Sequence, residues 1–103
     1  MIEIKSNIGV DKFISSLEMS VAAKVVKTVL LLKEFGHTLT MPHSKSIGRG
    51  LLELRIRSQQ EIRIIYCFRG GVSVQLLHGF IKKSQKIPQK EIDIALARMR
   101  GLT

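Results

Sequence analysis

Two neighbouring segments with a two-residue alternation constrain this chain more than any other feature. In Leu51–Arg57, apolar side chains alternate with charged ones, and Glu61–Arg69 begins the same pattern only three residues later. Because successive side chains of a β-strand point to opposite faces, each segment predicts a strand with one apolar face. The short connection, Ser58–Gln60, is typical of a hairpin turn, so we expect the two strands to pair antiparallel.

This hairpin predicts an unusual pairing of like charges. With Ser58–Gln60 as the turn, Arg57 lies opposite Glu61 and Arg55 lies opposite Arg63, with no partner for the two arginines. Like charges directly opposite each other destabilise a sheet, and two planar guanidinium groups suit a phosphate held between them. The alternative is a shifted register in which Glu53 pairs with Arg63 as an ordinary surface ion pair.

Length and composition favour one compact domain over residues 1–103. Hydrophobic residues make up 45% of the chain and there are 2 prolines, which is enough apolar content for one core without disulfides. The single cysteine, Cys67, lies within a predicted strand and is expected to be a core thiol rather than a nucleophile. Met1–Val10 lacks the pattern of a signal peptide, and the apolar run around Val29–Leu32 is too short to cross a bilayer. We therefore expect a cytoplasmic protein.

The positive charge is concentrated in the second half of the chain. The formal net charge is +9, but up to Pro42 five basic residues face four acidic ones, whereas from His43 onward twelve basic residues face four acidic ones. Such a surplus attracts polyanions, and nucleic acid is the leading candidate. A membrane surface would call for a basic amphipathic helix with aromatic anchors. Aromatic residues make up 5% of the chain, so we expect phosphate contacts to dominate over base stacking.

The remaining segments predict helices before the hairpin, then a third strand and a last helix. The pattern of the longer N-terminal helix predicts a buried stripe of Val21, Val25, Val29 and Leu32, widened by Ala22, Val26 and Leu30. The expected elements are an edge strand at Ile2–Lys5, a helix at Val10–Leu17, a helix capped by Ser20 and ending near Glu34, a long loop at His37–Gly50, a third strand at Val72–Ile81 after a Gly70–Gly71 turn, and a helix at Pro88–Met99.

These elements predict an α+β fold of two layers. We expect the two N-terminal helices to pack on one face of a small antiparallel sheet of three to four strands, followed by a C-terminal helix. The most apolar strand, Val72–Ile81, is expected at the centre of the sheet. The other face of the sheet is expected to be open, polar and basic, because Arg55, Arg57 and Arg63 lie on it.

Basic residues from two other segments are expected to close the sides of this face. Lys45 and Arg49 come from the loop before the first hairpin strand. Lys82, Lys83 and Lys86 follow the third strand. Each of them alone is most simply a solvated charge, but three segments that bring charge to one surface favour binding of a phosphate chain.

The candidate residues fit RNA cleavage without a metal ion. That reaction needs a base for the 2′-hydroxyl group, a cation to stabilise the phosphorane-like state and an acid for the leaving 5′-oxygen. The acidic residues of this half form no convincing oxygen cage, so we expect no metal ion and no cofactor. Candidates for proton transfer are His78, His43, Tyr66, Glu53 and the lysines. Alternation from Val72, Val74 and Leu76 places His78 on the helix-covered side, where it would be a core histidine. Packing is the expected use of Tyr66, and Glu53 is also suited to orienting an arginine.

Three segments together resemble a known family. They are MPHSKSIGRGLLELRIRS (Met41–Ser58), IRIIYCF (Ile62–Phe68) and LLHGFIKKSQKIPQKEIDIALARM (Leu76–Met99). With their pieces G-L-x-E-L-R, R-I-x-Y and H-G-F-x-K-K-x-x-K-x-P, they resemble the RelE/ParE toxin superfamily, specifically the phage-derived HigB-like branch of type II toxin–antitoxin systems. The resemblance covers about Phe13 to Arg100. It implies a RelE-like fold and a small cytoplasmic endoribonuclease that cuts mRNA on the ribosome and inhibits translation.

The resemblance also implies partners and site residues. The partner is an antitoxin, commonly a helix-turn-helix DNA-binding protein. Arg55 and Arg63 match residues that relatives use on the RNA phosphate, and Lys82 and Lys83 match the basic cluster after the last strand. RelE-type members often have a basic residue where this chain has Glu53, and some use a tyrosine near the last helix that is absent here, so the general acid and base stay unassigned. The candidate residues are therefore Arg55, Arg63, Lys82, Lys83 and His78 for catalysis, and Lys45, Arg49, Arg57 and Lys86 for RNA binding.

Two other functions fit the same sequence. A ParE-like inhibitor of DNA gyrase would use the fold for binding without RNA chemistry. A non-catalytic nucleic-acid-binding module would show salt-dependent affinity without cleavage. The basic sheet face favours the ribonuclease over the gyrase inhibitor, and the absence of cleavage with ribosomes present would identify the binding module.

Overall fold

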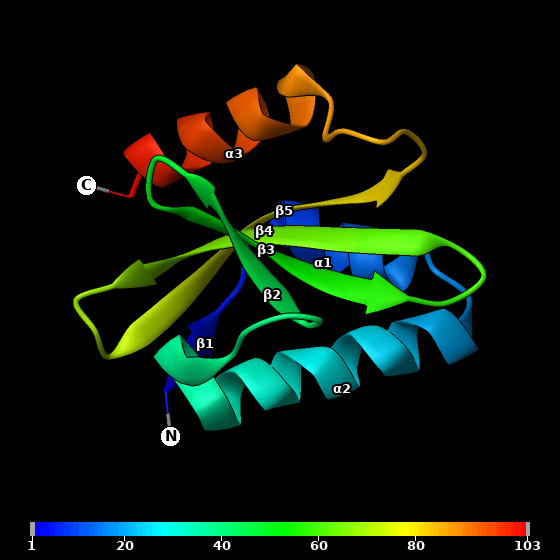
Figure 1. Ribbon diagram of the computed structural model, residues 1–103, viewed down its shortest axis with the longest axis horizontal. Coiled ribbons are helices and arrows are strands. Elements are labelled where there is room, and N and C mark those ends of the chain that lie inside the picture. The colour runs from blue at the N-terminus through cyan, green and yellow to red at the C-terminus, as the bar shows by residue number, and fades with distance from the viewer. Residues whose placement is uncertain (1, 103) are drawn as a thin grey trace.

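The structure has three layers, with the sheet in the middle. The computed structural model describes residues 2–102. In Figure 1, α2 lies on one side of the sheet and α3 on the other. The elements are β1 (Glu3–Lys5), α1 (Ile8–Ser15), α2 (Met19–Phe35), a short 3₁₀ turn η1 (Gly36–Thr38), β2 (Ser44–Gly48), β3 (Leu51–Arg57), β4 (Glu61–Arg69), β5 (Ser73–Lys82) and α3 (Gln89–Arg100). The α+β class is confirmed, but the two-layer arrangement is wrong, because α3 covers part of the face that was expected to be open.

The sheet has five strands in the order β1-β5-β4-β3-β2. The edge strand β1 pairs parallel with β5, and the other neighbours pair antiparallel. The prediction of three to four antiparallel strands is therefore wrong, and the central strand is β4 rather than β5. The segment expected as a loop, His37–Gly50, contains the last two residues of η1 and all of β2. β2 was missed because its sequence, SKSIG, shows no apolar alternation.

The hairpin is as predicted. β3 and β4 have the expected bounds, and the register pairs Arg57 with Glu61 and Arg55 with Arg63. The following Gly70 and Gly71 both have positive φ, at 62° and 74°, which is the backbone conformation of the tight turns that join antiparallel strands.

The larger core lies between the sheet and the two N-terminal helices. Its buried residues include Leu54, Ile56, Ile62, Ile64 and Tyr66 from the hairpin, and Val10, Val21, Val25 and Leu32 from the helices. The predicted widening of the α2 stripe is wrong at Val26 and Leu30, whose residues are 51% and 57% exposed. The predicted cap Ser20 is also wrong, because the residue before α2 is Glu18 and it makes no side-chain cap hydrogen bond.

A β-bulge in β5 changes the face that its side chains occupy. Tyr66 pairs with Leu76 and the preceding Ile65 pairs with His78, so Leu77 is the extra residue. The extra residue of a bulge reverses the alternation that follows it. The expectation that His78 shares a face with Leu76 is therefore wrong, since His78 lies opposite Ile65 on the α3 side.

Side chains from both flanking layers satisfy the carbonyl groups of the bulge. Asn7 Nδ2 donates to the carbonyl oxygens of Leu76 and Leu77, at 3.2 and 3.1 Å, and Arg98 Nη1 donates to that of Leu77 at 2.7 Å. Asn7 Oδ1 also accepts from the backbone N–H of Val10 and so caps α1. One residue thus joins the start of α1 to the bulge of β5.

A second core lies under α3. Its buried residues are Leu51, Ile65, Cys67, Leu77, Phe80, Ala95 and Leu96. Cys67 is buried here, as expected of a core thiol. None of the helices between residues 2 and 102 combines the length and apolar character that crossing a membrane requires. None of Arg55, Arg57 and Arg63 belongs to this second core, so these arginines occupy a part of the face that α3 does not pack against.

Candidate functional site

The hairpin places Arg55 directly opposite Arg63, in the type of cross-strand pair whose side chains lie closest together. The backbone N–H of Arg55 donates to the carbonyl oxygen of His43 at 2.8 Å, away from β4. Arg55 and Arg63 are therefore a non-hydrogen-bonded pair, in which side chains approach more closely than in a hydrogen-bonded pair. Two guanidinium groups in this position repel each other unless negative charge lies beside them.

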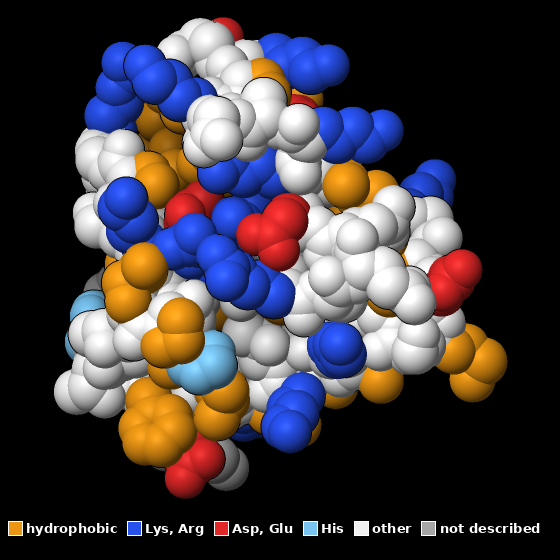
Figure 2. All heavy atoms as spheres, turned by 45° about the vertical axis from the view of Figure 1, so that its right-hand side comes forward, with side chains coloured by type: hydrophobic (Ala, Val, Ile, Leu, Met, Phe, Trp, Pro, Cys, Tyr) orange, Lys and Arg blue, Asp and Glu red, His pale blue; other side chains and the backbone are white. Residues whose placement is uncertain are grey.

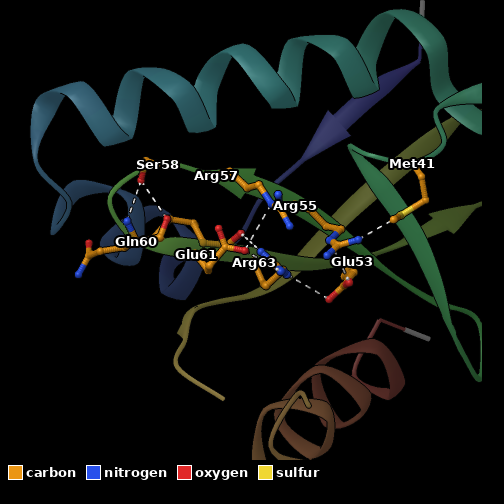
Figure 3. A network of polar contacts seen from close by, with 9 residues as sticks. Met41, Glu53, Arg55, Arg57, Ser58, Gln60, Glu61 and Arg63 are labelled. Atoms are coloured by element: carbon orange, nitrogen blue, oxygen red, sulfur yellow. Dashed lines mark hydrogen bonds and ion pairs between the residues drawn. The ribbon is translucent and has the colours of Figure 1, made fainter. Parts of the chain in front are cut away.

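Glu53 supplies that negative charge from the neighbouring position on β3. Its Oε1 lies 3.6 Å from Arg55 Nε and its Oε2 lies 3.5 Å from Arg63 Nε. Glu61 Oε1 lies 3.3 Å from Arg63 Nη2. The expectation that the two arginines are unpaired is wrong, although the predicted register is right, because the contact of Glu53 with Arg63 is diagonal across the ladder. Figure 3 shows Glu53 and Glu61 on either side of Arg63.

This network is buried at its centre and exposed at one end. Arg63 is 1% exposed and Glu53 is 5% exposed, whereas 77% of the Arg57 side chain is exposed. Within the described chain, Glu53 Oε2, Arg55 Nε and Arg63 Nε are buried without a hydrogen-bond partner. The charge attraction between Glu53 and the two arginines, over about 3.5 Å, therefore holds these side chains together. Three of their buried polar atoms lack a hydrogen bond.

A polar hollow opens above the arginines, and we call it the arginine hollow. It has a volume of about 540 Å³. It is lined by Arg55, Arg57, Glu61, Arg63, Lys82, Lys83, Ser84 and Gln85. Five of these side chains are cationic and one is a carboxylate, so the hollow attracts anions even with Glu53 beneath it. Figure 2 shows the blue side chains gathered around this region.

The strands and one connection position these cations. Lys82 ends β5 and lies opposite Glu61 on β4, and Lys83 begins the connection to α3. The predicted grouping of Arg55, Arg57, Arg63, Lys82 and Lys83 is therefore present in one hollow. Sequence analysis missed Ser84 and Gln85, and it missed Met41, whose Sδ accepts from Arg55 Nη1 at 3.1 Å. None of these three carries a charge or a pattern that would have pointed to the site.

The other proposed RNA-binding residues lie outside the arginine hollow. Lys45 lies opposite Glu53 in the β2–β3 ladder, and is therefore on the same sheet face as Arg55. Arg49 lies in the turn between β2 and β3 with a φ of 59°. Five residues, four of them in the extended strand β3, separate it from Arg55, a span of at most about 20 Å. Lys86 is exposed in the connection to α3.

His78 is held under α3 rather than in the arginine hollow. Its Nε2 lies 2.9 Å from Glu91 Oε1, its Nδ1 lies 3.4 Å from Arg98 Nη1, and its ring stacks on Phe80. Along β5 it is four residues, about 13 Å, from Lys82. His78 is therefore not part of the lining of the arginine hollow, although its neighbour on the same face of β5, Phe80, lies opposite Arg63.

Tyr66 and Cys67 have the properties of core groups. Burial raises the pKa of Tyr66, and a hydrogen bond from Ser44 opposes this shift only in part. Burial also raises the pKa of the Cys67 thiol, and the charge of Arg69 opposes that shift. Burial favours the neutral form of both groups, which agrees with the predicted packing roles.

The fold is shared with a toxin of known structure. A mutant of the E. coli toxin RelE in the free state superposes with a TM-score of 0.71 at 13% identity, over 95% of this chain and 97% of that chain. The family model described as phage derived protein Gp49-like matches residues 12–100. The chain therefore belongs to this phage-derived Gp49-like family, and it shares its fold with RelE. No curated protein matches the sequence.

Proposed function

We propose that this protein is the toxin of a type II toxin–antitoxin system and acts as a ribosome-dependent mRNA endoribonuclease. The observation that supports this most is the arginine hollow, where cations from β3, β4, β5 and the following connection line one uncovered end of the sheet. Family membership supports the toxin class.

The chemistry follows from what these side chains do to a phosphodiester. The RNA 2′-oxygen attacks the phosphorus, a new P–O2′ bond forms, and the P–O5′ bond breaks with the electron pair leaving on the 5′-oxygen. Arg55 and Arg63 stabilise the additional negative charge on the phosphoryl oxygens. Lys82 and Lys83 line the same hollow and can neutralise the leaving oxygen or donate a proton to it. Glu61 is the carboxylate of the hollow that is available to accept a proton.

Glu53 positions this machinery in our proposal. A single carboxylate shared by two guanidinium groups holds them close together before the substrate binds. Pre-arranged charge of this kind costs no reorganisation during the reaction. The arrangement also explains how a site can keep two arginines as an adjacent pair without an anion bound.

The proposed partners follow from the same assignment. The substrate is mRNA at the decoding site of the small ribosomal subunit, in the cytoplasm. The regulator is a cognate antitoxin, for which we propose a helix-turn-helix DNA-binding protein. An open reading frame for such a protein next to this one would support the assignment.

The decisive experiment maps cleavage in cells. We would express the protein from a controllable promoter and map the 5′-ends of messages by codon position. We expect new ends in translated regions, and we expect them to disappear in Arg55→Ala and in Lys82→Ala/Lys83→Ala. The matched control is Lys12→Ala/Lys90→Ala, which removes two exposed lysines outside the arginine hollow. Undiminished cutting by the first two variants would refute the site, and gyrase-linked DNA breaks with intact messages would replace the ribonuclease with a gyrase inhibitor.

A further inference from the structure

A second hollow lies on the other side of β3, and we call it the helix groove. It lies between α2 and the end of β3 and has a volume of about 380 Å³. It is lined by Lys24, Lys27, Thr28, Leu31, Pro42, His43, Arg55, Ile56 and Arg57. Arg55 and Arg57 line the arginine hollow as well. The two hollows therefore meet at these two side chains.

The edge of β3 is open where the hollows meet. The ladder between β2 and β3 ends with the pair of Ser44 and Leu54, followed by the hydrogen bond from Arg55 to His43. Beyond that point Ile56 and Arg57 have ladder partners on β4 alone. Because β2 begins only at Ser44, no strand of the described chain covers this edge of β3, and the helix groove and the arginine hollow connect around it.

The helix groove combines an apolar floor with a cationic rim. Leu31, Ile56 and Pro42 contribute apolar surface. Lys24 and Lys27 are exposed and lie three residues apart on α2, so their side chains are neighbours on one helix face. Among residues 2–102, neither lysine has a carboxylate within 4.0 Å. In Figure 2, blue side chains over α2 lie below the central basic cluster, on the same face of the molecule.

We propose that the helix groove binds a nucleotide of single-stranded RNA next to the linkage held in the arginine hollow. The nucleobase lies against the apolar floor, a phosphate lies between Lys24 and Lys27, and the chain passes around the open edge of β3 beside Arg57. This inference rests on the proposed RNA-binding function and extends it to a second subsite. Because Arg55 and Arg57 line both hollows, one nucleotide chain can occupy the two hollows at once. This favours RNA over an acidic protein segment as the occupant.

The test uses the length of the RNA. Binding of labelled oligouridylates of three and twelve nucleotides to the full chain would be measured by fluorescence anisotropy over a range of salt concentrations. For Lys24→Gln/Lys27→Gln we expect several-fold weaker binding of the twelve-nucleotide RNA and unchanged binding of the three-nucleotide RNA. The salt slope for the longer RNA should fall by about 0.7, since one phosphate is proposed to lie between the two lysines and each phosphate contact on a single strand contributes about 0.7. The control Lys12→Gln/Lys90→Gln makes the same charge change outside both hollows.

Several results would overturn the inference. Equal losses for both RNA lengths, or for both variant pairs, would show a general effect of charge rather than a subsite. Binding of a hexaglutamate peptide that is lost in Lys24→Gln/Lys27→Gln, with RNA binding unchanged, would assign the groove to an acidic protein segment. The binding measurement does not depend on cleavage. If the effect depends on RNA length but the protein cuts no message, the RNA subsite in the helix groove is supported and only the proposed ribonuclease activity is rejected.

Discussion

At the scale of single residues, one buried carboxylate determines how the arginines are held. Arg55 and Arg63 repel each other at a close strand pairing, and Glu53 lies within 3.6 Å of both. Arg63 and Glu53 are almost fully buried, and a buried charge is costly unless it is paired. The residues proposed to bind phosphate are thus also part of the folded structure.

Arg63→Ala should destabilise the protein strongly. It leaves Glu53 buried with Arg55 as its remaining partner, and breaking a buried ion pair costs about 3 kcal/mol or more. Arg57→Ala removes an exposed arginine from the same hollow and should cost less than about 1 kcal/mol. Urea denaturation followed by circular dichroism measures both. Equal losses of stability would contradict the importance of burial, and for the same reason Arg57→Ala is a better probe of function than Arg63→Ala.

The Cys67 thiol should be protected in the folded protein. Burial raises its folded pKa above the ordinary value of 9.0, so folding favours the protonated thiol. Its contribution to stability is complete below the unfolded pKa and is lost as the pH rises through the folded pKa. The free-energy difference between wild type and Cys67→Ala should therefore shrink as the pH rises above 9.0. A thiol reagent should react rapidly with urea-unfolded protein and slowly with folded protein at pH near 8, and rapid reaction in both states would contradict this view.

At the scale of elements, the structure depends on close contacts between β5 and its neighbours. The bulge at Leu77 is held from one side by Asn7, before α1, and from the other by Arg98 of α3. Two residues farther along β5, Gly79 packs against the ring of Phe13 from α1. The path of β5 is thus set by helices on both sides of the sheet.

Gly79→Ala should be destabilising. A Cβ atom at this position would overlap the Phe13 ring, and overpacking of this kind typically costs about 1–3 kcal/mol. Gly101→Ala is the matched control, because its nearest contact would be an ordinary 3.4 Å and its φ of −69° suits any residue. Thermal unfolding measures both variants. Adding Phe13→Leu to Gly79→Ala should restore part of the lost stability. If the double variant is no more stable than Gly79→Ala, the clash is not with the Phe13 ring.

At the scale of the whole molecule, the helices of the larger core and the excess of positive charge come from different parts of the chain. The first 42 residues are nearly neutral and supply β1 and the helices of the larger core, while the remainder carries the surplus of positive charge. The chain places five of those cations around one hollow. This concentration favours binding of a polyanion, and it also produces repulsion within the free protein.

Added salt should therefore stabilise the free protein. Raising sodium chloride from about 0.05 to 0.3 M shortens the range of repulsion among exposed cations. We expect the melting temperature to rise by about 3–6 °C, equivalent to somewhat less than 1 kcal/mol for a domain of this size. Differential scanning calorimetry measures the shift, which should be smaller in Lys82→Gln/Lys83→Gln than in Lys12→Gln/Lys90→Gln. Equal shifts in the two variants would show that the repulsion is not concentrated at the arginine hollow.

The sequence by itself determined the parts of the fold that depend on local pattern. The two-residue alternation predicted the bounds of β3 and β4 and their register, because side-chain direction in a strand depends on neighbouring residues alone. The same pattern placed Arg55 and Arg63 on one face and opposite each other. The basic segment at the end of β5 added Lys82 and Lys83 to the same group.

Only the tertiary structure decided which parts of that face stay open and how the charges are paired. The bulge that turns His78 toward α3 depends on Asn7, 70 residues away from Leu77, and on Arg98, 21 residues away. The contact of Glu53 with both arginines depends on where three long side chains come to rest across a ladder. The late start of β2 at Ser44, which leaves the edge of β3 open beside the helix groove, depends on pairing rather than on propensity. These features arise from contacts between distant segments, and local periodicity carries no information about such contacts.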